Sequence, residues 1–129
     1  MAYRNPPAMY QNTKVNTASP AELTLMLYDG AVKFTHMAIM ALEKGDLEQC
    51  HNNVQKAKKI IVEFRSTLNF DYEVAKDFDR VYDYIYWTLV QGNMKKDKDM
   101  LEEALKRIKE MRDTRKEVME KNKASQKNA

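Results

Sequence analysis

The chain of 129 residues has little of what a disulfide-stabilised, β-rich or membrane-spanning protein needs. It holds one cysteine, Cys50, so it cannot form an internal disulfide, and a reducing compartment is expected. Three glycines and three prolines are too few for the many tight turns of a β-sandwich or barrel. The longest uncharged stretches, such as residues 34–42, are too short to span a bilayer. No basic segment followed by an apolar one begins the chain, so no export signal is expected and the predicted location is cytoplasmic.

Charged residues make up 32% of the chain and apolar residues 43%, which is typical of a folded domain. The charges are unevenly distributed. Residues 95–129 carry twelve Lys/Arg and eight Asp/Glu, whereas residues 71–94 carry two basic and five acidic residues. Because the two signs alternate in the basic region, as on a solvated helix face, the pattern does not favour nucleic-acid binding.

Residues 1–18 differ from the rest of the chain and predict an extended, mobile N-terminal arm. Pro6 and Pro7 disfavour helix, because each lacks an amide donor and restricts the residue before it. The apolar residues of the arm, among them Tyr10, follow no regular period. The predicted organisation is therefore the arm, a helical bundle over residues 19–121, and a polar tail over residues 122–129.

Four helices joined by short links are predicted within residues 19–44, 46–68, 71–92 and 97–120. Ser19 and Glu22 flank Pro20 as a capping box, and Asp46, Asp71 and Asp97 are the predicted caps of the later helices. Apolar residues recur at steps of three and four, most regularly in the second helix, at Leu47, Cys50, Val54, Ala57, Ile61, Phe64 and Leu68. Since short links imply antiparallel neighbours, the predicted fold is all-α: an antiparallel up-down four-helix bundle with an extended N-terminal arm.

The first predicted helix has apolar residues on two sides, which is more than one bundle seam needs. One stripe is interpreted as core and consists of Leu23, Leu27, Gly30, Phe34, Ala38 and Ala41. The other is interpreted as a groove for a partner helix and consists of Leu25, Tyr28, Val32 and Ile39. Broad burial within the bundle and a homodimer contact remain alternatives.

Gly30 lies in the middle of this helix, where glycine costs about 0.5–1 kcal/mol relative to alanine. Close approach of another helix would explain a residue without a side chain at this position. The sequence therefore predicts a close helix contact at Gly30, made either within the bundle or with a partner.

The third predicted helix also carries more apolar surface than its seam uses. Beside the seam lie Tyr72, Tyr86, Trp87, Val90 and Met94, with two aspartates between them. Aromatic residues are favoured at interfaces because they give a large contact area for little rotamer entropy. These five residues are predicted to bind a partner, and the alternative is that the aromatic rings lie half-buried at the rim of the bundle.

Few residues fit a catalytic or metal site. Glu48 and His51 have the spacing of half a di-metal bundle site, but the other histidine, His36, has Lys33 at the matching position. Cys50 lies on an apolar seam, where a buried and unreactive thiol is expected. No catalytic residue, metal or cofactor is therefore predicted, although a ferritin-like metal enzyme and a basic nucleic-acid-binding bundle remain as alternatives.

The start of the first helix carries a recognisable motif. The segment reads Val15-x-Thr17-Ala18-Ser19-Pro20-Ala21-Glu22-Leu23, followed by Met26-Leu27-Tyr28-Asp29-Gly30-Ala31. It resembles the signature of the FliS family of flagellar secretion chaperones. The match continues in register at residues 57–61, 66–69 and 81–85 and covers nearly the whole chain. One position departs from the family, because Arg115 stands where a tryptophan usually lies near the end of the last helix.

The resemblance implies a chaperone and no enzyme. Proteins of this family bind the C-terminal segment of flagellin in the cytoplasm, prevent its premature polymerisation, and deliver it to the export gate of the flagellar type III secretion apparatus. The resemblance also implies a movable N-terminal arm that can occupy part of the flagellin site. Tyr10 matches an arm tyrosine that contacts the export gate. Neither nucleic acid nor insertion into the membrane is implied.

Overall fold

The computed structural model describes the backbone of residues 18–128 and the side chains of residues 18–122. Four helices make up the fold and no strand occurs within this range: α2 (Pro20–Glu43), α3 (Leu47–Ser66), α4 (Val74–Lys95) and α5 (Lys98–Asn128). The predicted all-α four-helix fold is confirmed. The predicted arm, with Tyr10, lies outside the described residues except for Ala18.

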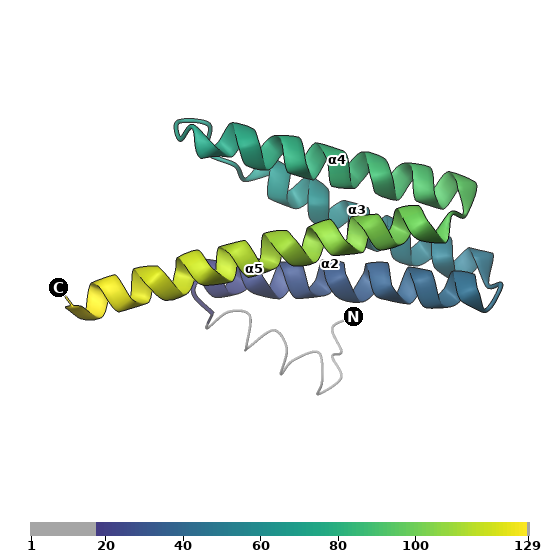
Figure 1. The fold of residues 1–129 in the computed structure, drawn as a ribbon, viewed down its shortest axis with the longest axis horizontal. Coiled ribbons are helices and arrows are strands. Elements are labelled where there is room, and N and C mark those ends of the chain that lie inside the picture. Colours follow the sequence, from purple (N-terminus) through teal and green to yellow (C-terminus); the bar gives the residue numbers. More distant parts are fainter. Residues whose placement is uncertain (1–17, 129) are drawn as a thin grey trace, which may run out of the picture.

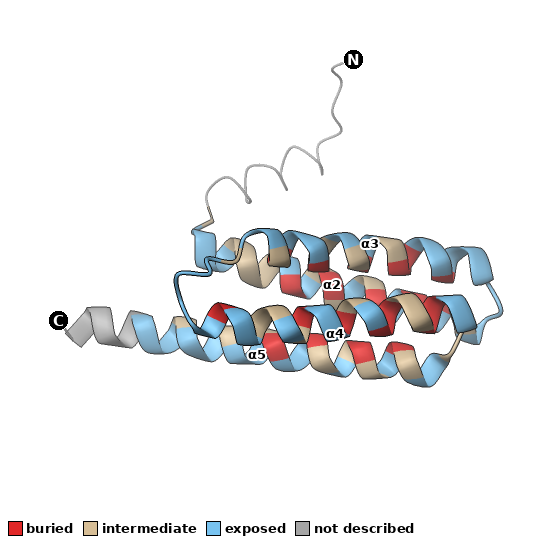
Figure 2. Cartoon of the chain, turned by 90° about the horizontal axis from the view of Figure 1, so that it is seen from above, coloured by how far each residue is buried: buried red, intermediate tan, exposed pale blue. Residues whose placement is uncertain are grey.

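Consecutive helices run antiparallel and form a closed ring of neighbours (Figure 1). Helix α2 packs against α3 and α5, and α4 packs against the same two helices from the other side. All buried faces point inward, which leaves the outer face of each helix in solvent (Figure 2). The single core is therefore lined by all four helices, as in other up-down bundles.

Side-chain caps start three of the helices where the sequence predicts them. The Ser19 hydroxyl accepts a hydrogen bond from the Glu22 amide at 3.2 Å and donates one to the Glu22 carboxylate at 3.0 Å. Asp46 accepts from the Gln49 amide at 3.1 Å, and Asp97 accepts from the Met100 amide at 3.2 Å. These bonds satisfy amides that have no partner within the first turn of a helix.

The predicted bounds of α4 are wrong at both ends. Asp71 does not cap it: the N-cap residue is Glu73, and no side chain accepts a hydrogen bond from the first turn. Asp71 lies in a turn before the helix, where its amide donates to the Asn69 side chain at 3.0 Å. The helix begins at Val74 and continues past Gly92 to Lys95, and Lys96 ends it with a left-handed φ of 49°. Gly92 is buried within the helix rather than ending it.

Helix α5 also continues past its predicted end near Glu120, and reaches Asn128. It contains no glycine or proline, so nothing in its own sequence stops the backbone hydrogen bonds. Residues 122–128, predicted as a polar tail, are polar in sequence but continue the helix. The last turns of α5 project beyond the other three helices (Figure 1).

The core follows the predicted seams of the second, third and fourth helices. Its buried residues from α3, α4 and α5 are Cys50, Val54, Ala57, Ile61, Phe64, Tyr82, Ile85, Leu89, Leu101, Ala104, Ile108 and Met111. Cys50 is fully buried, and this burial raises the pKa of its thiol. A thiol that is neutral and hidden from solvent is a poor nucleophile, which agrees with its interpretation as a core residue.

Candidate partner-binding surface

The stripe of α2 that was interpreted as a partner groove lies largely in the core. Tyr28 is 1% exposed and Ile39 is 4% exposed, and Val32 packs against the buried cluster. The ring of Tyr28 stacks on Phe64 with 4.3 Å between centroids. The assignment of Tyr28 and Ile39 to a partner groove is therefore wrong, because the bundle interior faces this side of α2.

The other side of α2 carries the exposed apolar residues. Leu27, Met37 and Met40 are exposed, and Phe34 is half-buried, although Leu27 and Phe34 were interpreted as core. This side lies at the edge between α2 and α3, where the ammonium of Lys56 lies 5.4 Å from the centroid of the Phe34 ring. Ala38 and Ala41 of the predicted core stripe are buried, so the core takes residues from both stripes, and the exposed apolar residues of α2 lie at its edge with α3.

Gly30 of α2 packs closely against α3. A Cβ added to Gly30 would lie 3.3 Å from Cδ1 of Ile60 on α3, a tight contact that a small shift of the Ile60 side chain would relieve. The close contact predicted at this glycine is thus present and is made within the bundle. It brings α3 near enough to α2 for the two helices to share one apolar edge.

Helix α4 and the loop before it present the largest exposed apolar side chains. Tyr72 is 65% exposed, Trp87 is 53% exposed and Met94 is 74% exposed. Tyr86 and Val90 are half-buried beside them, and the ammonium of Lys58 lies 5.3 Å from the centroid of the Tyr86 ring. These five residues are thus exposed or half-buried, and their contact with a partner stays a prediction.

The two aspartates beside these aromatic residues form an ion-pair cluster with α3. The Arg65 guanidinium contacts Asp79 at 2.8 Å and Asp83 at 3.1 Å. The hydrogen bonds and charges of the two aspartates raise the pKa of Arg65. The cluster holds the first half of α4 against the end of α3, and it removes two unpaired negative charges from a largely apolar face.

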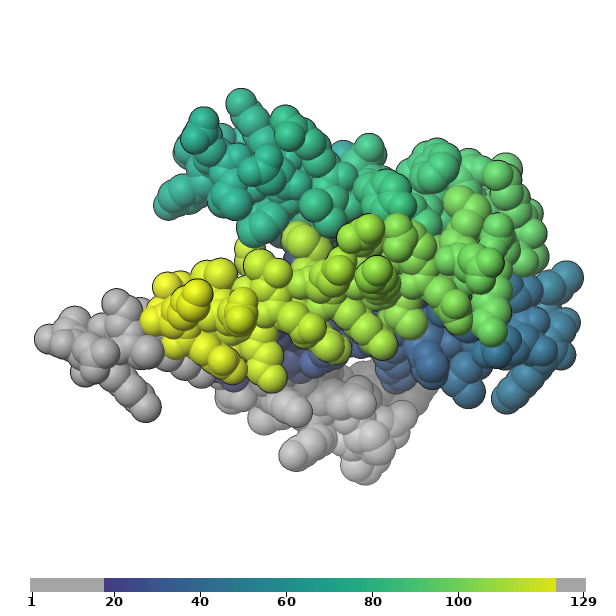
Figure 3. Space-filling view, in the orientation of Figure 1, coloured from purple at the N-terminus to yellow at the C-terminus, as the bar shows by residue number. Residues whose placement is uncertain are grey.

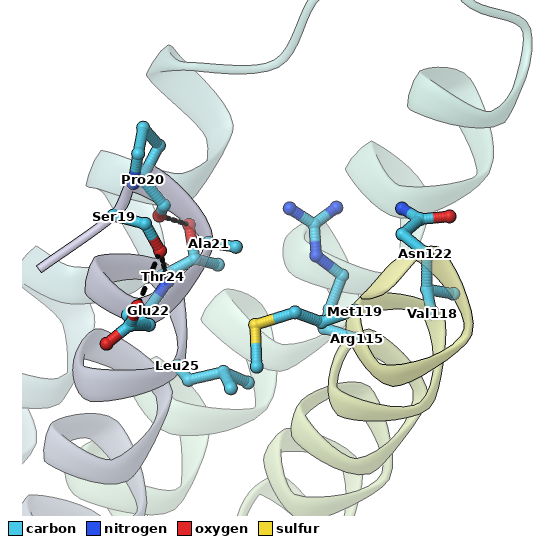
Figure 4. Close-up of a pocket in the computed structure, with 10 residues that line it drawn as sticks. All are labelled: Ser19, Pro20, Ala21, Glu22, Thr24, Leu25, Arg115, Val118, Met119 and Asn122. Atoms are coloured by element: carbon cyan, nitrogen blue, oxygen red, sulfur yellow. Dashed lines mark hydrogen bonds between the residues drawn. The ribbon is translucent and has the colours of Figure 1, made fainter. Parts of the chain in front are cut away.

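Two adjoining pockets open at the end of the bundle where α2 begins. The larger has a volume of about 620 Å³ and lies between α2 and the last turns of α5 (Figure 4). Its lining residues are Ser19, Pro20, Ala21, Glu22, Thr24, Leu25, Arg115, Val118, Met119 and Asn122. The smaller has a volume of about 230 Å³ and is lined by Thr24, Phe64, Thr67, Leu68, Asn69, Tyr72, Val74, Ala75, Phe78, Tyr82 and Arg115.

Both pockets share Thr24 and Arg115, and we refer to them together as the end groove. Met119 reaches across the larger pocket toward Leu25 (Figure 4). The first half of α4 and the last part of α5 diverge at this end, which leaves a notch in the molecular surface (Figure 3). The lining of the end groove is both apolar and polar, and the Arg115 guanidinium lies at the junction of its two parts.

An aromatic stack closes the inner side of the end groove. Phe64 lies between Tyr28 and Tyr82, with centroid distances of 4.3 and 5.5 Å. The hydroxyls of Tyr28 and Tyr82 are hydrogen-bonded to each other in the interior. Burial raises the pKa of both tyrosines, so both remain neutral at ordinary pH. The floor of the groove is therefore rigid, uncharged and polar only at one internal hydrogen bond.

Comparison with known proteins identifies the family. The model of the family described as flagellar protein FliS matches residues 3–122. The flagellar secretion chaperone FliS of Bacillus subtilis is 43% identical over 120 residues, which cover 93% of this chain and 90% of that protein. The chain belongs to the FliS family.

Two more distant relatives of the FliS family carry the same name. FliS of Salmonella typhimurium is 34% identical over 92 residues, covering 69% of this chain and 68% of that protein. FliS of Vibrio cholerae is 28% identical over 103 residues, covering 78% and 76%. The resemblance seen in the motif at the start of α2 is confirmed, and all three relatives are named as secretion chaperones.

The residues that suggested a metal site do not gather with further metal ligands in the part of this FliS-family chain that the structure describes. Glu48 and His51 are both exposed on α3, and the Nδ1 atom of His51 lies 2.9 Å from Nδ2 of Asn93. Within the part of the chain that the structure describes, no three metal-ligating side chains come together. Over the same range, no helix is long and apolar enough to cross a membrane.

The end groove is the feature of this FliS-family chain that sequence reasoning missed. Its lining includes Phe78 of α4 and residues 115–122 of α5, where the local spacing of apolar residues predicts no pocket. The one available signal was Arg115, which departs from the tryptophan usual in the family. A long cationic side chain at the end of an apolar seam indicates that the seam is not closed there.

Proposed function

We propose that this chain is a cytoplasmic export chaperone that binds the C-terminal segment of flagellin, prevents premature filament polymerisation and delivers flagellin to the flagellar type III export gate. The family match over residues 3–122 supports the proposal, since the relatives are named flagellar secretion chaperones. The exposed apolar residues support it as well. A segment that is unfolded until it binds needs a preformed apolar surface on which to fold.

The flagellin segment is proposed to contact two regions. The first is the face of α4 with Tyr72, Tyr86, Trp87, Val90 and Met94. The second is the end groove, where Leu25 lines the larger pocket. Val32 is a proposed flanking residue on α2, and Gly30 acts indirectly by setting the distance between α2 and α3.

The α4 face is tested by replacing its exposed tryptophan. Trp87→Glu should weaken binding of the flagellin segment at least tenfold, because it puts a charge where an apolar contact forms. The melting temperature should stay close to that of the parent, since Trp87 is 53% exposed. Titration calorimetry and thermal unfolding measure the two effects.

Asn52→Glu is the matched control, because it adds the same charge at an exposed position of α3. It should bind the flagellin segment as the parent does. If Trp87→Glu binds normally but a dimeric parent becomes monomeric in light scattering, the α4 face is a homodimer contact instead.

The arm over residues 1–18 is proposed to occupy part of the flagellin site in the free chaperone. Its displacement by flagellin would free Tyr10 to contact the export gate, so that loading and docking are coupled by competition. Deleting residues 1–14 should leave the bundle folded, hold or tighten flagellin affinity, and abolish binding to the cytoplasmic domain of the export gate. Much weaker flagellin binding by the truncated chain would show that the arm belongs to the site.

A further inference from the structure

Arg115 occupies the junction of the two parts of the end groove. Its guanidinium carbon lies 5.5 Å from the centroid of the Phe78 ring, and the side chain is only half-buried. The larger pocket extends from it along Val118 and Met119, and the smaller one extends toward Tyr72. A molecule that fills both pockets therefore has to pass the guanidinium.

Arg115 differs from every other arginine that the structure describes. The other four each form an ion pair with a carboxylate: Arg65 with Asp79, Arg80 with Asp77, Arg107 with Glu110, and Arg112 with Asp29. Within residues 18–122, no carboxylate makes an ion pair with Arg115. The Phe78 ring packs against one face of the guanidinium but accepts no hydrogen bond from its five N–H groups.

Glu22 lines the same pocket as Arg115, but its carboxylate accepts a hydrogen bond from the Ser19 hydroxyl at 3.0 Å and makes no ion pair with the guanidinium. Residues 1–17 and 123–128 contain no aspartate and no glutamate. Helix α5 carries the chain onward to Asn128, about 20 Å along the helix axis from Arg115 at 1.5 Å per residue. The guanidinium of Arg115 is therefore open to a carboxylate of another molecule.

We propose that Arg115 binds an aspartate or glutamate of the flagellin C-terminal segment, and that apolar residues beside this carboxylate fill the end groove. The inference rests on the proposed function and adds a determinant of specificity to it. The planar guanidinium offers two parallel N–H donors to a carboxylate, in a setting where Phe78 and Met119 limit competition from water. A tryptophan at this position could fill the groove but could not select a carboxylate.

A double-mutant cycle tests the pairing. The purified full-length chain is titrated with the C-terminal segment of its own organism's flagellin, and with variants in which each Asp or Glu is singly replaced by Asn or Gln. Arg115→Gln should weaken binding of the parent segment about tenfold or more. One of the segment variants should lose as much affinity for the parent chaperone, and should lose almost nothing further against Arg115→Gln.

Three further variants separate pairing from packing. Lys116→Gln removes a positive charge from the same turn outside the groove and should leave affinity unchanged. Arg115→Lys should retain part of the dependence on the carboxylate. Arg115→Trp should bind the segment with no such dependence. Binding to the parent chaperone should also weaken more steeply with added salt than binding to Arg115→Gln.

The possible outcomes are distinguishable. If the parent chaperone does not bind the flagellin segment at all, the proposed function fails, and this inference fails with it. If the parent binds but the losses from Arg115→Gln and from every segment variant are simply additive, the proposed function stands and the pairing is overturned. Equal affinity of Arg115→Gln and the parent, with both folded by circular dichroism, overturns it as well.

Discussion

The helices pack differently at the two ends of the bundle, although the same spacing of apolar residues runs along them. At the end where α2 joins α3 and α4 joins α5, both links are short turns. Gly45 takes a φ of 79°, and the Lys98 ammonium reaches Glu43 of α2 at 3.2 Å. Gly92 lets α5 approach so closely that an added Cβ would lie 2.8 Å from Leu101. Small residues and short turns hold the helices together at this end, where a pocket of about 250 Å³ lies between the end of α2 and the start of α3.

The opposite end has none of these closing devices among its described residues. A longer link joins α3 to α4, α2 begins there, and α5 runs past the other helices (Figure 1). Where the closed end has a glycine in the contact between α4 and α5, this end has Phe78 and Arg115, which hold the two helices apart around the end groove. The difference is one of packing: α4 and α5 are in close contact at one end and are separated by the end groove at the other.

The largest expected effect is a loss of stability when a side chain is added at Gly92, in the closed end of the bundle. Gly92→Leu should destabilise the fold by about 3 kcal/mol, because the new side chain overlaps Leu101 in a packed interior. The midpoint of urea unfolding measures it. Gly30→Ala is the matched control and should change stability by less than about 1 kcal/mol, since its new methyl meets only the end of the Ile60 side chain. Equal effects from the two variants would mean that the closed end is not the tighter one.

A smaller effect is expected at the floor of the end groove. Tyr28→Phe should cost about 1–3 kcal/mol, because it leaves the buried Tyr82 hydroxyl without its partner. The double variant with Tyr82→Phe should be more stable than the sum of the two single losses, since neither hydroxyl then remains unpaired. Additive losses in the same unfolding experiment would show that the two hydroxyls act independently.

The same pair predicts how stability depends on pH. Both tyrosines have a raised pKa in the folded chain, so the folded state keeps protons that the unfolded state loses above about pH 10. Their contribution is fully present below that pH and is lost as the pH rises further. The free energy of unfolding should fall more steeply above pH 10 in the parent than in the double phenylalanine variant.

The smallest effect is expected where ionic contacts hold the open end. Arg65→Met should cost about 1 kcal/mol, because it removes the ion pairs that join α3 to α4. High salt should reduce the difference from the parent. Arg80→Met is the control: its ion pair with Asp77 is exposed and lies within α4, so no measurable change is expected. If Arg80→Met lowered the free energy of unfolding as much as Arg65→Met, the role assigned to Arg65 in joining α3 to α4 would be contradicted.

The helices were predictable because their signals are local. The Ser19 capping box and the three-and-four spacing in α3 each depend on residues within a few turns of one another. The bounds of α4 were less predictable, because the helix begins after Glu73 without a side-chain cap. Gly92 was interpreted as a helix end, but its role is to admit a neighbouring helix, which no local pattern reveals.

The sequence by itself determined the family, the four helices and an excess of apolar surface on the first and third of them. Only the tertiary structure decided which residues of the two apolar stripes of α2 are core, because each stripe contributes some of them. Tyr28 is buried because it packs in the stack with Phe64 and Tyr82. The tertiary structure also revealed the end groove, because a cavity forms between residues such as Leu25 and Met119 that meet only when distant helices pack.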